Sequence, residues 1–258
     1  MQIAAQIKKR FPFIVGLWRA VFRQLHWPVG EYGRSIWLQR EFERLIQPED
    51  KYILNAGCGQ GANTISLAQI YPQLTFVGVD IDKDVIQVAN DLGLDQLVSN
   101  VNFYVGFLQS LSLKEASFSK IIIFEVLTVV EDDQMTMANL ARSLKSGGHL
   151  IIHVPSSDHA HFLGPLSPTR FPGRVRYGYN PHSLTKLLEE HGFEVEMVRH
   201  TFGIFAGTAW ELWHILGYHP LLWPLRFILR PLYLAAVWVD LRHNCKKGRG
   251  LLCVAKRK

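Results

Sequence analysis

The stretch KYILNAGCGQGANTISLAQIYPQLTFVGVDID, residues 51–82, decides the fold. It opens with an apolar run that predicts a buried strand, and Gly57, Gly59 and Gly61 follow directly after it. A helix is predicted next, over 62–71. Glycine allows a tight turn and lets a ligand approach the backbone without a Cβ in the way. The pattern therefore indicates a nucleotide-binding turn between a strand and a helix.

An acidic residue ends the second predicted strand, LTFVGVD (74–80). At that position Asp80 can accept hydrogen bonds from both hydroxyls of a ribose. The spacing Gly57-x-Gly59-x-x-Ala62 also satisfies the loose dinucleotide pattern, so the loop alone leaves NAD open as the ligand.

Strands and helices alternate along the rest of the chain. Strands are predicted over 52–57, 74–80, 101–106, 120–127, 147–155, 193–199 and 250–258. Helices are predicted over 35–46, 62–71, 82–94, 133–144 and 183–190. This alternation predicts an α/β fold with a parallel sheet that is covered on both faces. We expect one domain, with an N-terminal helical cap (1–49), a core (50–201 and 250–258) and an apolar helical insertion (202–249).

Composition sets broad limits on function. The 258 residues are 48% hydrophobic and 19% charged, which supplies a core and disfavours disorder. The net charge of +6 suits nucleic acid, an anionic membrane surface or an acidic substrate. The 3 cysteines form no metal or disulfide pattern, which favours the cytoplasm.

The N-terminal segment KKRFPFIVGLWRAVF resembles a signal peptide only in part, because Arg19 interrupts its apolar run and no cleavage site follows. We interpret it as mature sequence. No stretch reaches the ~18 uninterrupted apolar residues that span a bilayer, so we expect no integral membrane segment.

The insertion at 202–249 is rich in Trp, Leu and Pro. Pro220, Pro224 and Pro231 are expected to divide it into short helices. Its long basic side chains lie beside aromatic ones, which suits the surface of an anionic membrane, and the N-terminal leader offers a second such contact. Core or dimer packing explains the apolar residues equally well. Nucleic acid is disfavoured, because the basic residues form no polar stripe.

Several motifs, in order, resemble those of the class I S-adenosylmethionine-dependent methyltransferases. ILNAGCGQG is similar to the family's first motif and VGVDID to its second-strand acid. FEVLTVVED is similar to the fourth-strand motif, and LARSLKSGGHLIIHVP to the segment that leads into strand five. The resemblance covers about residues 35–200 and the terminal strand. It implies a Rossmann-like seven-stranded sheet with strand order 3-2-1-4-5-7-6 and strand seven antiparallel.

The resemblance also implies the cofactor and its contacts. Gly57, Cys58, Gly59 and Gly61 would line the methionine half of S-adenosylmethionine, with Asp80 at the ribose and Ile81 beside the adenine. The residues expected further along the cofactor are Phe107 and Leu108 at the adenine edge, and Phe124 and Glu125 near the sulfonium and amino groups.

Three positions depart from the family's pattern. Asn55 stands where an acid is common, and it would accept a hydrogen bond from the methionine ammonium without the charge contribution. Phe107 replaces a frequent Asp, which keeps stacking but loses a contact with the adenine amine. Val129 stands where many relatives have a histidine.

The acceptor side offers three candidate general bases. His153 lies near the end of the fifth predicted strand, His159 follows in PSSDHAHF, and Tyr179 precedes a helix. A base is needed only where the acceptor loses a proton, as a hydroxyl does. We expect no metal site, because His159 and His161 have no evident third ligand.

These patterns predict a methyltransferase that acts on a small or lipid-linked acceptor, at an oxygen. The chain lacks the Asn/Asp-Pro-Pro-Tyr pattern after strand four, which disfavours methylation of nucleic-acid bases. Two other classes remain open. An NAD-dependent oxidoreductase would differ in strand order, and a catalytically silent cofactor-binding module would bind the cofactor without turnover.

Overall fold

The computed structural model describes residues 29–111, 113–159, 161–167, 173–218, 222, 225–243 and 245–258. The N-terminal leader, with its expected second membrane contact, lies outside the described residues, as do Pro220 and Pro224.

The fold is built on one seven-stranded sheet with the order β3-β2-β1-β4-β5-β7-β6. Strand β7 is antiparallel to both of its neighbours, whereas the other pairs are parallel. The predicted fold class and strand order are therefore confirmed. The strands are β1 (Tyr52–Ala56), β2 (Thr75–Asp80), β3 (Val101–Val105), β4 (Phe118–Phe124), β5 (Leu144–Pro155), β6 (Phe193–Thr201) and β7 (Gly250–Arg257).

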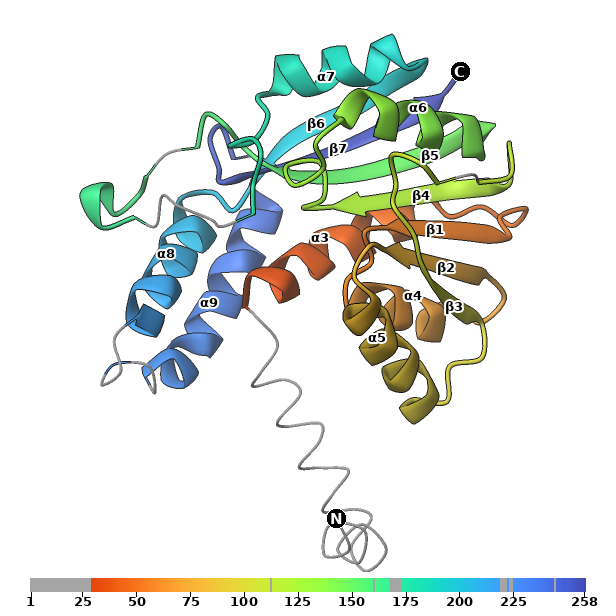
Figure 1. Ribbon diagram of the computed structural model, residues 1–258. Helices are drawn as coiled ribbons and strands as arrows, with labels where there is room; N and C mark the ends of the chain where they lie inside the picture. The colour runs from red at the N-terminus through yellow and green to blue at the C-terminus, as the bar shows by residue number, and fades with distance from the viewer. Residues whose placement is uncertain are drawn as a thin grey trace, which may run out of the picture.

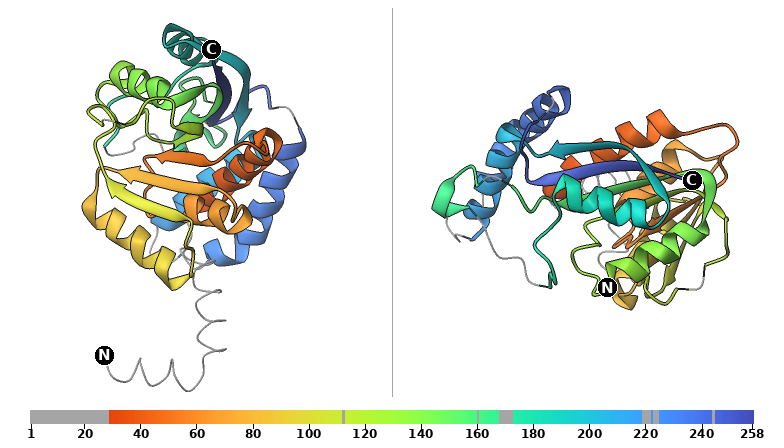
Figure 2. Two further views of the ribbon diagram at one scale, coloured as in Figure 1. Left: turned by 90° about the vertical axis from the view of Figure 1, so that its right-hand side faces the viewer. Right: turned by 90° about the horizontal axis from the view of Figure 1, so that it is seen from above.

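Helices cover both faces of the sheet (Figures 1 and 2). Helices α6 (Asp133–Ser143) and α7 (Pro181–Glu190) pack against one face. The opposite face is covered by α3 (Val29–Leu45), α4 (Ala62–Ile70), α5 (Lys83–Asp95), α8 (Ile204–Tyr218) and α9 (Leu225–Arg242). The central strands are buried on both sides, and for this reason their sequences are continuous apolar runs such as Ile121–Ile123.

Side-chain caps fix where several helices begin. The Asp82 carboxylate accepts hydrogen bonds from Asp84 N and Val85 N at the start of α5, and Asn180 forms a capping box with Ser183 at the start of α7. Helix α4 begins after Gly61, and no side chain in the described part of the chain caps it. Its first backbone N–H groups therefore remain available at the glycine loop.

The insertion folds into two helices, α8 and α9, which lie side by side next to α3 (Figure 1). The break expected at Pro231 is wrong, because Pro231 lies inside α9. The loss of one backbone hydrogen bond there is offset by burial of Tyr233 and Val237 in the core. None of the described helices combines the length and the apolarity needed to cross a bilayer.

Candidate functional site

The glycine loop between β1 and α4 has the backbone shape that the sequence predicts. All three glycines have left-handed φ values, 75° at Gly57, 54° at Gly59 and 77° at Gly61. A Cβ at Gly57 would lie 2.1 Å from Val126 Cγ2, whereas a Cβ at Gly59 would meet no atom within 4 Å. Glycine is therefore required at Gly57 by packing, and at Gly59 the loop leaves open space for a ligand.

Asp80 is held by the same loop. Its Oδ2 accepts a hydrogen bond from Gly59 N (2.8 Å) and its Oδ1 accepts one from Asp82 N (3.1 Å). A carboxylate has about four acceptor positions, so two remain for the two hydroxyls of a ribose. The contact with Gly59 also couples the position of the carboxylate to the shape of the loop.

Two apolar side chains stand exposed where adjacent strands end. Ile81 follows β2 and is 62% exposed, and Phe107 follows β3 and is 43% exposed. Leu108 is buried beside them, and its carbonyl oxygen accepts a hydrogen bond from Asn139. Neighbouring parallel strands end at the same edge, so Ile81 and Phe107 offer apolar surface for a flat ring next to Asp80.

Asn55 and Cys58 are buried near the loop. Asn55 Nδ2 donates a hydrogen bond to Thr64 Oγ1 (2.8 Å), which ties β1 to α4. Contact between Asn55 and a cofactor therefore stays a prediction. Burial, together with the charge of Asp80, raises the pKa of the Cys58 thiol to about 12, so this side chain is a neutral thiol.

Glu125 follows β4 with a left-handed φ of 63°, a conformation that is rare for a residue with a Cβ. Its carboxylate contacts His153 Nδ1 (2.8 Å) and Arg174 Nη2 (3.4 Å). Burial acts to raise the pKa of Glu125. The charge of Arg34, the hydrogen bond from His153 and the charge of Arg174 outweigh burial and lower this pKa to about 2. Glu125 is therefore a fixed negative charge at the carboxyl edge of the sheet.

His153 uses both ring nitrogens inside the protein. Glu125, being ionised, only accepts, so Nδ1–H donates to it and Nε2 accepts from Thr201 Oγ1 at 2.8 Å. Burial lowers the pKa of His153 and keeps the ring neutral. The Phe124 ring lies 5.4 Å from the His153 ring, centroid to centroid. With no nitrogen left for an acceptor, His153 positions Glu125.

His159 has a different arrangement. Its Nδ1 lies 2.7 Å from the carbonyl oxygen of Ser156, so this nitrogen carries the hydrogen and Nε2 carries the lone pair. Nε2 is buried and has no hydrogen-bond partner among the described residues. Burial lowers the pKa of His159, so the ring is neutral at neutral pH. The His161 ring lies 4.7 Å away, and no three potential metal-ligating side chains converge in the described part of the chain.

Tyr179 lies apart from this group. Its hydroxyl is 2.5 Å from Asp133 Oδ2, and burial and the hydrogen bond to Asp133 raise its pKa. The hydroxyl is thus a protonated donor inside the protein. The Tyr179 backbone pairs with Pro155 and Ser157, but its side chain is not among those that line the cavity with His153 and His159.

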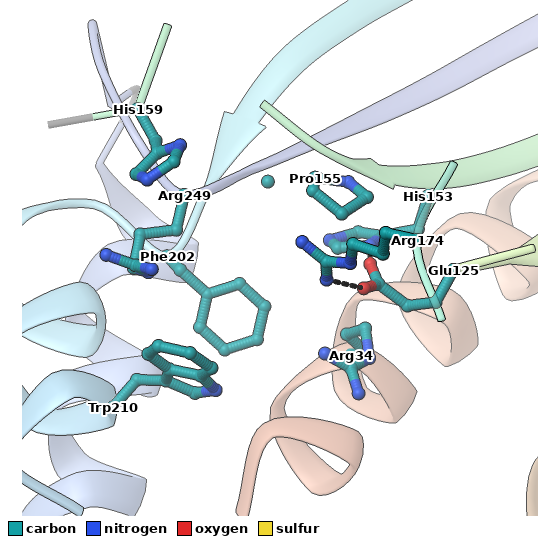
Figure 3. A pocket seen from close by; sticks show the side chains of 10 residues that line it. Arg34, Glu125, His153, Pro155, His159, Arg174, Phe202, Trp210 and Arg249 are labelled. Atoms are coloured by element: carbon teal, nitrogen blue, oxygen red, sulfur yellow. Dashed lines mark hydrogen bonds and ion pairs between the residues drawn. The ribbon is translucent and has the colours of Figure 1, made fainter. Parts of the chain in front are cut away.

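A cavity of about 50 Å³, open to solvent, lies beside Glu125 at the carboxyl ends of β4 and β5 (Figure 3). It is lined by Arg34, Glu125, His153, Pro155, His159, Arg174, Phe202, Trp210, Arg249 and Gly250. Figure 3 shows Glu125, Arg174 and Arg34 on one side of the space, and Phe202, Trp210, Arg249 and His159 on the other.

Sequence reasoning missed several of these side chains, namely Arg34, Arg174, Phe202 and Trp210, and it assigned Arg249 to a lipid contact. One usable indication was Glu211, an isolated charge in the apolar insertion. Glu211 is fully buried and pairs with Arg249. It also accepts hydrogen bonds from Leu163 N (2.8 Å) and Ser167 Oγ (2.7 Å). A buried charge of this kind needs partners, and one of them, Arg249, lines the cavity.

Comparison with known proteins places this geometry in a family. The sequence matches a protein-family model described as a methyltransferase domain over residues 48–178, just over half of the chain. It is 30% identical over 159 residues to O-methyltransferase cnsE of Penicillium expansum, which covers 59% of this chain and 55% of that protein. It is 36% identical over 147 residues to trans-aconitate 2-methyltransferase of Deinococcus radiodurans, covering 54% of each. The chain thus spans about half the length of these curated relatives.

Solved structures share the fold. The crystal structure of a geranyl diphosphate C-methyltransferase from Streptomyces coelicolor, in complex with Mg²⁺, geranyl diphosphate and S-adenosyl-L-homocysteine, matches with a TM-score of 0.62 and 13% identity. The match covers 88% of this chain and 78% of that one. A putative sarcosine dimethylglycine methyltransferase from Galdieria sulphuraria matches with a TM-score of 0.63 and 12% identity, over 87% of this chain and 85% of that one.

The residues present fit S-adenosylmethionine. Gly59 leaves open space, Asp80 has two acceptor positions left, and Ile81 and Phe107 expose apolar surface next to it. The antiparallel β7 between β5 and β6 is the feature expected to separate a methyltransferase from an NAD-dependent oxidoreductase. The chain therefore belongs to the methyltransferase-domain family, whose fold and cofactor are those of the class I S-adenosylmethionine-dependent methyltransferases.

Proposed function

We propose that the protein transfers the methyl group of S-adenosylmethionine to an oxygen of a small acceptor bound in the cavity beside Glu125. The observation that carries this proposal is His159 Nε2, a neutral and unpartnered nitrogen in the described part of the cavity wall. A hydroxyl needs such a base when it becomes a nucleophile. Relatives named as O-methyltransferases support the choice of oxygen.

Each group at the site has a distinct task in this proposal. S-adenosylmethionine, when bound, supplies an electrophilic methyl group on a sulfonium. The glycine loop and Asp80 hold its methionine and ribose parts, and Ile81 and Phe107 cover its adenine. Glu125, fixed by His153, faces the positive charge of the amino group. Alignment of the acceptor and exclusion of water supply most of the rate, up to about 7–11 kcal/mol.

His159 is proposed as the general base. As the acceptor oxygen bonds to the methyl carbon, its proton passes to His159 Nε2 and the Ser156 carbonyl steadies the charged ring. With S-adenosylmethionine bound, S-adenosylhomocysteine would be the leaving group, and the His159 ring returns its proton to solvent. His153 and Tyr179 are not proposed as bases, because their polar atoms are engaged inside the protein.

Calorimetric titration of the purified chain with S-adenosylmethionine, S-adenosylhomocysteine and NAD tests the cofactor side. We expect micromolar binding of the first two ligands and a large loss of affinity in Asp80→Ala, with Asp84→Asn as the exposed control. Binding of NAD alone would overturn the proposal. Formation of S-adenosylhomocysteine with hydroxylated acceptors then tests catalysis.

A catalytically silent binding module is the second candidate. Asn55 favours it, because its amide is already bonded to Thr64 where the family commonly has a free acid. A silent module would bind S-adenosylmethionine tightly but would form no S-adenosylhomocysteine with any acceptor.

We also propose that the protein works at the cytoplasmic surface of an anionic membrane. On α9, Leu225, Ile228 and Leu232 share one helix face and are 41%, 71% and 66% exposed. Basic residues of the same helix and of the segment after it, Arg230, Arg242, Lys246 and Lys247, add positive charge to this region. Such a surface suits a lipid-linked acceptor as well as a soluble one.

Co-sedimentation with anionic liposomes tests the membrane proposal. We expect binding at low salt that weakens at high salt, and clear weakening in Ile228→Glu/Leu232→Glu. The matched control is Val88→Glu, which changes an exposed apolar residue on α5. No sedimentation at low salt would contradict the proposal and leave the methyltransferase proposal intact.

A further inference from the structure

The cavity carries three guanidinium groups, and among the residues that the structure describes two of them pair with a carboxylate. Arg174 Nη2 lies 3.4 Å from Glu125 Oε2. Arg249 pairs with Glu211, which is fully buried. Arg34, on α3, forms no ion pair with any residue that the structure describes, although it lines the cavity.

The surplus positive charge is not cancelled by the other lining residues. His153 and His159 are neutral, since burial lowers the pKa of both. The charges also affect one another, because burial and then the charge of Arg34 act to lower the pKa of Arg174. A partly buried cationic cluster of this kind is relieved by an anion, which can form charge-assisted and bidentate hydrogen bonds with guanidinium groups.

The opposite wall of the cavity carries two aromatic side chains beside Arg249 and His159. Phe202 and Trp210 face the space across from Glu125 and Arg174 (Figure 3). Arg249 Cζ lies 4.4 Å from the centroid of the Trp210 ring, so the guanidinium covers one face of this ring. This wall suits an apolar or planar body attached to the anionic group.

We propose that the acceptor is an organic anion, a carboxylate or a phosphate monoester, whose anionic group binds Arg34 and Arg174 and whose body lies against Phe202 and Trp210. This inference rests on the proposed function, because it takes the cavity to be the acceptor site. The anionic group is a binding handle, and the methylated oxygen is a separate hydroxyl that faces His159.

Arg34 is the residue to test. A change at Arg249 would remove the ion-pair partner of the buried Glu211 and destabilise the wall. A change at Arg174 would remove a partner of Glu125. Arg34 forms no ion pair in the described chain, so Arg34→Gln removes one positive charge without breaking one, and Glu125 keeps its contacts with His153 and Arg174.

The experiment is calorimetric titration of the full chain, saturated with S-adenosylhomocysteine, with benzoate, phenyl phosphate, decyl phosphate and neutral benzamide. At least one anion is expected to bind tenfold or more tightly than benzamide, which corresponds to about 1.4 kcal/mol. Arg34→Gln should weaken that anion at least tenfold and leave benzamide unchanged. The affinity of Arg34→Lys for that anion should lie between those of the wild type and Arg34→Gln, because lysine keeps the positive charge but loses the planar guanidinium that forms two parallel hydrogen bonds.

Arg142→Gln is the matched control, because this exposed arginine on α6 does not line the cavity and its contacts are long, to Asn139 Oδ1 at 3.3 Å and to Glu115 at 3.9 Å. It should leave every affinity unchanged. Preference for benzoate or for phenyl phosphate identifies the anion. Tighter binding of decyl phosphate than of phenyl phosphate points to a lipid headgroup, and the reverse order to a small soluble acid.

The proposal is overturned if benzamide binds as tightly as the anions, if Arg34→Gln keeps the preference for anions, or if none of the four compounds binds. The affinity for S-adenosylhomocysteine, measured for each variant in the same cell, separates this failure from a failure of the proposed function. Normal cofactor binding without anion binding defeats only the anionic acceptor, whereas no cofactor binding defeats the proposed function itself.

Discussion

Two neighbouring regions of the same sheet edge are built in different ways. The cofactor side takes its residues from a continuous part of the chain, 55–108, and is shaped by backbone: left-handed glycines and N–H groups that bind Asp80. The cavity takes residues from Arg34 to Gly250, and side-chain charges hold it together. A single substitution should therefore act locally on the cofactor side, whereas in the cavity it should reach several elements at once.

The largest effect is expected at His159, where the two regions meet in one reaction. His159→Gln should lower kcat about 10²–10⁴-fold and leave cofactor affinity unchanged, because it removes only the proton acceptor. In the wild type, the lowered pKa of His159 should place the acid limb of the kcat/KM profile below the ordinary histidine value of 6.5. Rates measured from pH 5 to 9 test both statements.

His161→Gln is the control for this prediction, since its ring neighbours His159 and it is not among the residues that line the cavity. Equal loss of rate in both variants would assign the effect to the loop and remove His159 from the proposed chemistry.

The next effect concerns the stability of the cavity wall. Glu211→Gln should lower the free energy of unfolding by about 3–5 kcal/mol, because Arg249 is then a buried charge without its partner. Urea denaturation followed by circular dichroism measures the change, with the exposed Glu189→Gln as control. The double variant Glu211→Gln/Arg249→Gln should be less destabilised than the sum of the single variants. Strict additivity would show that the pair does not hold the wall.

A smaller effect should appear at low pH. The pKa of Glu125 is lowered from 4.5 to about 2, so the folded state releases this proton more readily than the unfolded chain. Ionised Glu125 therefore stabilises the fold by about 3 kcal/mol at most above about pH 5, and this contribution is lost as the pH falls toward 2. In Glu125→Gln the free energy of unfolding should fall less steeply as the pH is lowered. The midpoints of urea denaturation between pH 3 and 7 measure this difference. Parallel profiles for the two proteins would contradict it.

The smallest effect on stability is expected in the glycine loop. Gly59→Ala places a methyl group in open space with a left-handed φ, at a cost of about 1–2 kcal/mol, but it narrows the ligand space and should weaken S-adenosylmethionine binding. Gly57→Ala should destabilise more, because its Cβ would lie 2.1 Å from Val126. Thermal unfolding and calorimetry on both variants separate packing from binding. Equal loss of stability would contradict the distinction.

The contrast between the cofactor side and the cavity also explains which features could be predicted from the sequence. The glycine loop and Asp80 depend on neighbours in sequence, and a strand that ends in glycines before a helix has few structural outcomes. The strand order, by contrast, was implied by the resemblance to the methyltransferase motifs. Helix α3 begins six residues before its predicted start at 35, because packing of its first turns against α8 and α9 extends it. Helix α9 continues through Pro231 for a related reason.

The cavity could be predicted only in part. His153 and His159 were found because they lie near the end of the fifth strand and just after it, but their opposite roles depend on Glu125, Thr201 and Ser156, which no local pattern connects. Arg34 and Trp210 are distant in sequence and meet through the packing of α3 against α8. The approach of side chains that are distant in sequence depends on the tertiary structure, so a single sequence contains no periodic pattern that predicts it.

The buried Glu211 has a consequence for how the cavity selects its ligand. It joins the loop after β5, helix α8 and Arg249 through one carboxylate. These groups are ordered before any ligand arrives, so little conformational entropy remains to be lost when one binds; each flexible side chain fixed in advance saves about 0.5–1.5 kcal/mol. Preorganisation of this kind favours ligands that already match the cavity and penalises those that would have to reshape it.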